Sequence, residues 1–384
     1  MKKMTVIGIL AAFCVFLTCG VAGAVAQGAC SNCHTMHNMQ NGQVVAAGGP
    51  YGVLLKGSCY GCHSQGLTTG QNIVNNTPQV AHTNATDLAG GNFAYIIGSK
   101  NVDLNDSVAV ANPDTVGHNV SELGNPEGYD AMFPPPGDEY AQAITAANFT
   151  CGGLYGCHGD RTAADSYAAV KGSHHVNDTV LKFGASLDET AQGGTTALSY
   201  RFLKGVKGAE ASNWQNTDSN NHNEYKGATD GVEAGSATTP GGGTISGLCA
   251  ECHGNFHGPR AVGSDITNTA TGSPWLRHPT DIILPNSSEY QYYNGGVGGG
   301  AASTYSVNAP VARADTINSA NYPLPKNTAT PGTNDAIVMC LSCHMVHGSA
   351  NADILRWNYE DISAGTGADA TRCFICHTTK DTGS

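Results

Sequence analysis

Charged and aromatic residues are scarce in this 384-residue chain: Asp, Glu, Lys and Arg make up 12% of it, and Phe, Trp and Tyr only 7%. So few large apolar side chains are a weak basis for an ordinary hydrophobic core of this length. Lys and Arg number 18 against 30 Asp and Glu, which gives a formal net charge of −12. This acidity argues against nucleic acid as a partner.

No run that could span a membrane follows the N-terminal segment. Met1-Lys2-Lys3 precedes an apolar stretch from Met4 to Leu17 and small residues up to Ala26, which is the pattern of a secretory signal. We therefore predict a cleaved signal peptide over residues 1–26, and Cys14 and Cys19 leave with it. The mature protein is expected to be exported and secreted, with the periplasm as the alternative.

Twelve of the fourteen cysteines form six Cys/His clusters. Five have the strict form Cys-x-x-Cys-His: Cys30–His34, Cys59–His63, Cys249–His253, Cys340–His344 and Cys373–His377. This pattern is typical of c-type haem attachment, in which two thioethers fix the porphyrin and the adjacent His binds the iron. Five strict copies, with no mature cysteine left over, favour haem over zinc or disulfides. We predict six covalent haems on Cys30, Cys33, Cys59, Cys62, Cys151, Cys157, Cys249, Cys252, Cys340, Cys343, Cys373 and Cys376.

The sixth cluster, Cys151–His158, is a stretched relative with five residues between its cysteines. Cys157 and His158 can still supply one thioether and the proximal ligand. Cys151 must cross a bulge that contains Gly152, Gly153 and Gly156, residues that make such a turn sterically possible. A haem held by a single thioether is the alternative at this motif.

The spacing of the motifs leaves roughly 60 residues for each haem, and the segments between them are rich in Gly and Pro turns. We predict a single domain over residues 27–384, mostly irregular coil with short helices and few short strands, organised around a chain of haems. Helices are expected after the attachment motifs and over Asp138–Ala147, and strands around Tyr200–Leu203 and Tyr290–Tyr293. The strings CSNCHTMH and CLSCHMVH, each followed about 30 residues later by another strict motif, indicate a repeated two-haem unit.

The chain has more histidines than the six that belong to the attachment motifs. Fifteen are present, and we assign six as proximal iron ligands: His34, His63, His158, His253, His344 and His377. The nine others exceed the six distal positions, which indicates bis-His irons closed to substrate, and hence electron transfer rather than catalysis. The favoured distal ligands are His37, His82, His118, His175, His278 and His347. His174, His222 and His257 stay open, since His174 and His175 are adjacent and either could serve.

Two of the favoured ligands, His37 and His347, stand three residues after a motif histidine. That offset is too short for either to close the far face of the haem carried by its own motif. Each must therefore reach a different haem.

At these residues the chain resembles the OmcS-type hexahaem outer-surface cytochromes that polymerise into extracellular nanowires. The resemblance covers most of the mature chain and is carried by CSNCHTMHNMQNG, DLAGGNFAYI with GHNV, SYRFLKGVKG, LCAECHGNFHG, SPWLRHPTDI, and CLSCHMVHGSANADILRW followed by CFICH. It implies bis-His haems in a continuous chain, with protomers joined head to tail. It also implies that His37 ligates a haem of the next protomer, that of Cys340–His344. The stretched third motif departs from the family pattern.

Three functions compete at this stage. The favoured one is a non-enzymatic conduit that takes electrons from periplasmic or outer-membrane cytochromes to extracellular acceptors. The second is a monomeric periplasmic electron carrier. The third is a multihaem reductase of a small oxidised nitrogen compound, which would require an open iron or an unusual ligand such as Lys, and no Cys-x-x-Cys-Lys motif occurs.

Overall fold

A computed structural model describes residues 29–47, 49–75, 77–100, 116–124, 144–145, 148–170, 203, 205–209, 217–229, 243–253, 280–314, 325–365 and 371–380. The signal segment, His174, His175, His257 and His278 lie outside these residues, as does most of Asp138–Ala147. Over the described residues most of the chain is irregular, which confirms the predicted fold class. No helix in these ranges is both long and apolar enough to cross a membrane.

The helices are single turns or little more. The α-helices are α2 (Cys59–His63), α3 (Gly66–Thr69), α4 (Ser166–Ala169) and α6 (Ile245–Ala250). The 3₁₀ helices are η1 (Cys30–Asn32), η2 (Gly52–Leu54), η4 (Ser121–Leu123), η12 (Ser288–Gly295), η13 (Cys340–Ser342), η14 (Ala352–Ile354) and η15 (Arg372–Ile375). Tyr290–Tyr293 therefore lies within η12, and the predicted strand there is wrong. Of Tyr200–Leu203 only Leu203 is described, in an isolated bridge to Gly159.

Five of the motifs lie on helical turns themselves, so the helices are not confined to the residues after the motifs. Short polar side chains start two of these turns: Ser58 caps α2 by accepting from the Gly61 N–H, and Thr244 caps α6 by accepting from the Gly247 N–H. The motif lies at the start of α2 but at the end of α6. The stretched motif instead forms two strands.

The strands pair in twos within the described ranges. They are β1 (Met39–Gln40), β2 (Gln43–Val44), β3 (Ile73–Val74), β4 (Thr77–Pro78), β5 (Thr150–Gly152), β6 (Gly156–His158), β7 (Gly208–Ala209), β8 (Glu224–Tyr225), β9 (Ile282–Ile283), β10 (Ser303–Thr304), β11 (Thr328–Ala329) and β12 (Ile337–Val338). The pairs β1–β2, β3–β4, β7–β8, β9–β12 and β10–β11 are antiparallel, and β5–β6 is parallel. With so little regular structure, the architecture depends on contacts between distant loops.

Three small clusters of buried side chains take the place of one core. The first contains Val206, Ile245 and Ile337, and the third contains Phe93 and Val116. The second surrounds Tyr293, Tyr305 and Trp357 and packs against the motif cysteines Cys343, Cys373 and Cys376. The apolar clusters thus lie against the attachment motifs, as expected where a bound cofactor completes the core.

The first and fifth motifs have the same local structure. In each, a 3₁₀ turn on the motif is followed by a bridge from the motif histidine to a leucine, His34 to Leu55 and His344 to Leu355. The backbone bonds match as well, with Lys56 N–H donating to Cys33 O and Arg356 N–H to Cys343 O, both at 2.8 Å. The first and fifth motifs therefore share a local repeat. The second and sixth motifs do not match in the same way, since one forms the α-helix α2 and the other the 3₁₀ helix η15.

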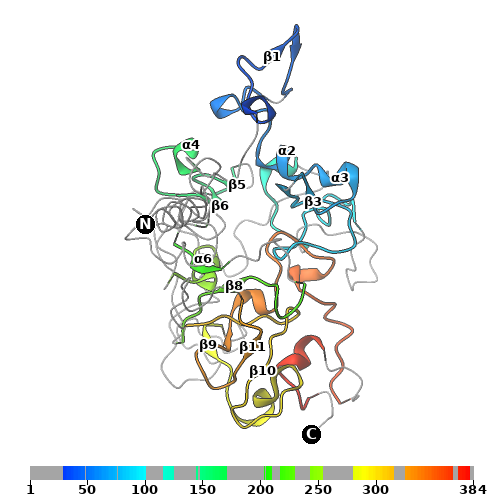
Figure 1. The fold of residues 1–384 in the computed structure, drawn as a ribbon, viewed down its shortest axis with the longest axis vertical. Coiled ribbons are helices and arrows are strands. Elements are labelled where there is room, and N and C mark those ends of the chain that lie inside the picture. Colours follow the sequence, from blue (N-terminus) through cyan, green and yellow to red (C-terminus); the bar gives the residue numbers. More distant parts are fainter. Residues whose placement is uncertain are drawn as a thin grey trace, which may run out of the picture.

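The two units differ by an insertion. The histidine contacts a carbonyl 19 residues later in the first unit and 9 residues later in the fifth. The additional residues of the first unit form the β1–β2 hairpin, which projects beyond the other described elements at the top of Figure 1. Its apolar residues Met36, Met39 and Val44 are 79%, 50% and 58% exposed. We call residues 36–44, which include His37, the arm.

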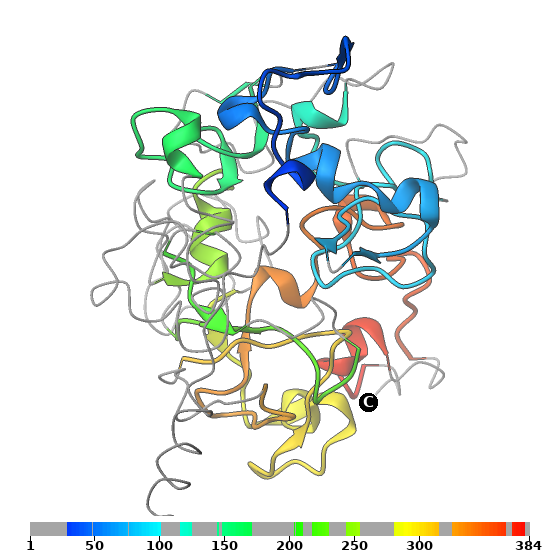
Figure 2. The same cartoon turned by 45° about the horizontal axis from the view of Figure 1, so that its top comes forward.

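The segment after the fifth motif packs against the N-terminal third of the chain. Gly91 bridges Gly348 in parallel, and the Asn92 N–H donates to Gly348 O at 2.9 Å. Figure 2 shows these orange and cyan segments side by side. A Cβ on Gly91 would lie 2.2 Å from Gly348 O, and Gly91 has a φ of 93°, so a side chain at this contact would be strained as well as obstructed. This contact brings His347 into the interior.

Candidate haem attachment sites

The six motifs lie next to one another in the order of the sequence. None of their twelve cysteines, all among the described residues, forms a disulfide. In every pair of consecutive motifs, one thiol contributes to raising the pKa of another: Cys33 on Cys62, Cys59 on Cys151, Cys157 on Cys252, Cys340 on Cys249 and Cys373 on Cys343. Such effects require short separations, because Coulomb interactions weaken with distance. The attachment sites therefore form a continuous series from the first motif to the sixth.

Four of the half-buried motif cysteines have thiol pKa values well above the usual range. Burial is the largest cause and raises the pKa of Cys252, Cys343 and Cys376 to about 12. For Cys249 the largest cause is a hydrogen bond with Cys340, which raises its pKa well above the usual range. These thiols are neutral at physiological pH, and thioether formation would leave them permanently uncharged.

In the stretched motif the two cysteines stand opposite each other. The register of β5 and β6 pairs Thr150 with Gly156 and Gly152 with His158, which places Cys151 across from Cys157. Residues opposite each other on neighbouring strands point to the same face. A Cβ on Gly156 would lie 2.6 Å from the Gly152 Cα, so glycine is required for this approach. The geometry favours two thioethers over one.

A cysteine substitution tests this arrangement. Cys151→Ala is expected to leave haem attached through Cys157 alone and to shift one sixth of the pyridine haemochrome absorption toward that of a haem with a free vinyl group. The same change at Cys59, in a strict motif, is the matched control and should produce a shift of equal size. If Cys151→Ala left the haemochrome spectrum unchanged while Cys59→Ala altered it, the third haem would hold a single thioether in the wild type.

Hydrogen bonds at Nδ1 set the tautomer of four motif histidines. Nδ1 of His34, His63 and His344 lies 2.9, 2.7 and 2.8 Å from the carbonyl oxygens of Val53, Pro78 and Asp353. A carbonyl can only accept, so Nδ1 carries the proton and Nε2 presents a lone pair. In His377, Nδ1 lies 3.1 Å from a carboxylate oxygen, Glu289 Oε1. Such second bonds orient an imidazole for metal ligation.

In both repeated units, the carbonyl that accepts from the motif histidine belongs to a turn with a strained backbone. Val53 and Leu54 have φ of 50° and 57°, and Asp353 and Ile354 have φ of 55° and 51°. Left-handed conformations are rare for non-glycine residues and cost roughly 1–3 kcal/mol each. The same strained pair recurs where the carbonyl meets the motif histidine, so its recurrence fits a requirement of the site.

Two pairs of imidazoles have the spacing of axial ligands. The ring centroids of His158 and His347 are 6.3 Å apart, and those of His118 and His253 are 6.2 Å apart. Two imidazoles on opposite sides of one iron, each with a metal–nitrogen distance of about 2 Å, place their centroids about 6 Å apart. The structure thus brings together two motif histidines and two of the distal ligands named from sequence. His347 lies beside the third motif rather than its own.

The surroundings of His118 keep its imidazole neutral and fix its orientation. Its Nδ1 donates to Val346 O at 2.6 Å, which leaves Nε2 for iron. Burial lowers its pKa to about 4, helped by the neighbouring His253. Its ring also meets Phe149 edge-on, with centroids 6.3 Å apart. A neutral, oriented imidazole is the form that binds a metal.

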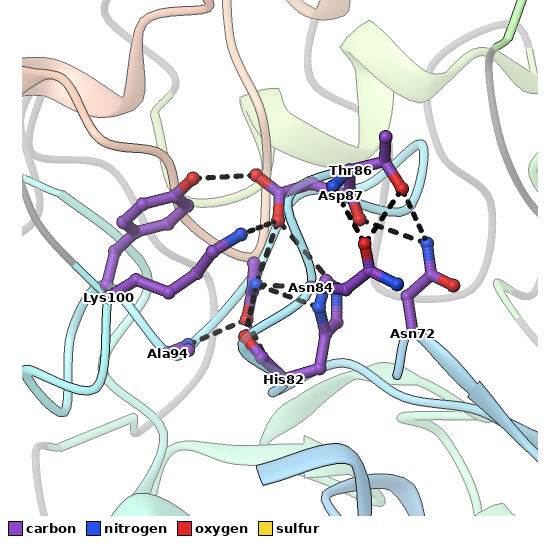
Figure 3. A network of polar contacts seen from close by, with 9 residues as sticks. Asn72, His82, Asn84, Thr86, Asp87, Ala94 and Lys100 are labelled. Atoms are coloured by element: carbon purple, nitrogen blue, oxygen red, sulfur yellow. Dashed lines mark hydrogen bonds and ion pairs between the residues drawn. The ribbon is translucent and has the colours of Figure 1, made fainter. Parts of the chain in front are cut away.

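His82 is fully buried in a polar network (Figure 3). Asn92 holds its backbone by accepting from the His82 N–H at 3.2 Å and donating to His82 O at 2.9 Å. Asp87 accepts from Asn92 and from Lys100, at 2.8 and 2.6 Å. Burial lowers the His82 pKa to about 4, the Asp87 carboxylate opposing this shift. The imidazole therefore stays neutral. Its nitrogens make long contacts, 3.4 and 3.5 Å, with Asn92, and Nε2 lies 3.7 Å from Asp87 Oδ1.

Sequence reasoning ranked His222 low, yet its surroundings are those of a ligand. It is fully buried and stacks on Tyr305 with centroids 3.7 Å apart. Neither ring nitrogen has a hydrogen-bond partner among the described residues, although Nε2 lies 3.6 Å from Glu224 Oε1. An unsatisfied buried polar group costs about 1–3 kcal/mol, and coordination to iron would remove that cost. No feature of its local sequence distinguished it from the other spare histidines.

Glu289 was also missed from the sequence. A lone glutamate in the string SSEYQYY carries no signal for contact with a histidine 88 residues later. Only the packing of η12 on η15 brings the two together.

The residues of these sites fit c-type haem. Paired thiols stand beside histidines whose protons are held at Nδ1, and two second imidazoles lie at the separation that one iron requires. No group of three or more His, Cys, Asp or Glu side chains among the described residues is arranged to hold a metal ion. These residues could hold c-type haem, and at the third and fourth motifs a second imidazole lies close enough to ligate the same iron.

Comparisons with known proteins were made for the whole chain. The family model described as Doubled CXXCH motif matches residues 331–382. Two similar solved structures come from Geobacter sulfurreducens. The outer membrane cytochrome S filament is 18% identical, covers 94% of this chain and 92% of its own, and has a TM-score of 0.49. The OmcS nanowire structure is 19% identical, covers 94% of each chain, and has a TM-score of 0.47.

No curated protein matches the chain. The segment matched by the family model holds two complete Cys-x-x-Cys-His motifs. Such doubled motifs indicate covalently bound c-type haem. Residues 331–382 are therefore a paired attachment segment for c-type haem.

Proposed function

We propose that this protein carries electrons along six bis-His haems and polymerises head to tail into an extracellular filament, acting as a conduit rather than an enzyme. The observation that carries the proposal is the position of His37. In the fifth unit the equivalent residue, His347, lies beside the histidine of another motif. His37 is instead exposed on the projecting arm. A ligand displayed in this way is suited to an iron of a second molecule.

The cysteines and the histidines have different roles in holding the haems. Haem supplies reversible one-electron chemistry when bound. The motif cysteines anchor it, and the Nδ1 bonds of His34, His63 and His344 orient the proximal nitrogens. His118 and His347 close the distal faces at the fourth and third motifs. Closed irons exclude substrates and favour electron transfer over catalysis.

The series of thiols supports a sequential path. Consecutive motifs are neighbours from the first to the sixth, so the haems would follow the order of the sequence. The ends of that path belong to the N-terminal arm and to the C-terminal pair of motifs. Joining one end to the other in successive protomers extends the path without a break.

The arm is also suited to protein contact. Met36 adjoins His37 and is 79% exposed, and Met39 and Val44 form an apolar face on the hairpin. Exposed apolar groups of this kind mark sites of association. Following the family resemblance, we assign the haem of Cys340–His344 in the next protomer as the partner of His37. His82, His175 and His278 are proposed for other distal positions, and His222 joins them as a further candidate.

Cryo-electron microscopy of the natively secreted protein tests the function directly. Filaments with an unbroken haem chain, bridged by His37, are the expected result. Discrete particles with six closed haems would contradict polymerisation and support a periplasmic carrier. A high-spin haem with an open position would instead support a reductase. Upstream cytochromes and extracellular acceptors would then be sought as electron donors and acceptors of the filament.

A further inference from the structure

The sixth motif differs from the first, second and fifth motifs in the hydrogen-bond partner of its histidine. Nδ1 of His377 lies 3.1 Å from Glu289 Oε1, a carboxylate oxygen. The corresponding nitrogens of His34, His63 and His344 meet neutral backbone carbonyls. A carbonyl and a carboxylate both accept the Nδ1 proton, but only the carboxylate carries a negative charge. The difference is therefore electrostatic rather than a difference in tautomer.

The carboxylate is held firmly in this position. Glu289 is 7% exposed, and its second oxygen accepts from Thr379 Oγ1 at 3.4 Å. Its backbone carbonyl accepts from Thr378 Oγ1, so the two residues that follow His377 both bind Glu289. The Tyr290 ring meets the His377 ring edge-on, with centroids 5.2 Å apart. η12 and η15 therefore present Glu289 and His377 to each other in one arrangement.

A carboxylate at Nδ1 changes the donor strength of Nε2. The negative charge draws the proton toward oxygen and gives the imidazole partial imidazolate character, which raises the basicity of the ligand. A more basic axial ligand stabilises ferric iron over ferrous iron, and second-sphere hydrogen bonding is an established means of setting haem potentials. Burial strengthens the effect, because the interaction is poorly screened.

We propose that Glu289 is a positioning residue that lowers the reduction potential of the haem on Cys373–His377. The inference rests on the proposed attachment of haem at this motif. The reaction is the gain of one electron by that iron, from the neighbouring haem or from a chemical reductant in a titration. The Nδ1 proton stays on His377, and no covalent bond forms or breaks. The haem at one end of the conduit would thereby have a different driving force for electron transfer from the haems of the interior.

Glu289→Gln provides the test, because the amide keeps the size of the side chain and an accepting oxygen but removes the charge. We expect spectroelectrochemical titration of the purified protein to show one haem in six moving from the low-potential end toward higher potential. Low-spin ferric signals in electron paramagnetic resonance should change for that same single haem. Glu360→Gln is the matched control, since it removes one charge from an exposed side chain, and its titration should superimpose on the wild type.

Two further measurements distinguish a failure of this inference from a failure of the proposed function. The haem-to-protein ratio, by mass spectrometry and pyridine haemochrome, tests attachment at the sixth motif independently of its potential. Six haems with a Glu289→Gln titration identical to the wild type would overturn the inference and leave the proposed function intact. A missing sixth haem in the wild type would overturn both. Glu289→Asp guards against a folding defect, since it keeps the charge and should shift the potential less than Glu289→Gln.

Discussion

His37→Ala is expected to abolish filament formation while leaving six covalent haems on every chain. The substitution removes no thioether and no described contact within the protomer core, because His37 is exposed on the arm. It removes the imidazole that we assign to an iron of the next molecule, so one haem per protomer should become high-spin or bind water. Negative-stain imaging, size-exclusion chromatography and the high-spin signal in electron paramagnetic resonance measure the two effects together.

Gln40→Ala is the matched control for this prediction, because Gln40 is exposed on the same hairpin and has no metal-binding group. It should polymerise normally. Added imidazole should return the open haem of His37→Ala to low spin without restoring filaments, since a free ligand cannot join two protomers. Filaments of normal length from His37→Ala would show that another residue links the protomers.

His347→Ala is expected to open the haem of the third motif and to destabilise the protomer. Its imidazole lies beside that of His158, and the pair would connect segments about 190 residues apart, for which the chain-entropy estimate of a cross-link is roughly 5 kcal/mol. The ring also packs on Phe93, with centroids 4.9 Å apart. Carbon monoxide binding to the reduced protein would report the open iron, and denaturant unfolding the loss of stability.

His118→Ala serves as the comparison, because it should open a different haem, that of His253. Compared with the wild type, each single variant should bind one additional carbon monoxide per chain, and the double variant two. These additional equivalents do not depend on whether the chains polymerise. If His347→Ala bound no carbon monoxide and kept six low-spin haems, the pairing of His347 with His158 would be wrong.

The attachment residues could be named from sequence because their chemistry is local. In the five strict motifs the two cysteines and the histidine lie within five residues of one another, so the spacing itself indicates the cofactor. The irregular fold was likewise predictable, since 7% aromatic residues and abundant glycine cannot form large regular layers around an ordinary core. The repeated unit was visible in CSNCHTMH and CLSCHMVH and recurs as matching backbone bonds.

The distal histidines show the limit of that reasoning. The offset of His347 from His344 excluded its own haem but could not select another, because that choice depends on the contact between Gly91 and Gly348. His222 looked like any spare histidine until its complete burial and its stacking on Tyr305 were known. The strand at Tyr290–Tyr293 was predicted wrongly because aromatic residues favour strands, whereas here the packing of Tyr293 in the second cluster accompanies a 3₁₀ turn.

The sequence by itself indicated c-type haem and the residues predicted to anchor it, since both follow from the spacing of residues a few positions apart. Only the tertiary structure decided which histidine faces which motif, that Cys151 stands opposite Cys157, and that Glu289 meets His377. Each of these is a contact between chain segments joined by a turn or a long loop. Such contacts are selected by the total packing and hydrogen bonding of the molecule rather than by any local pattern.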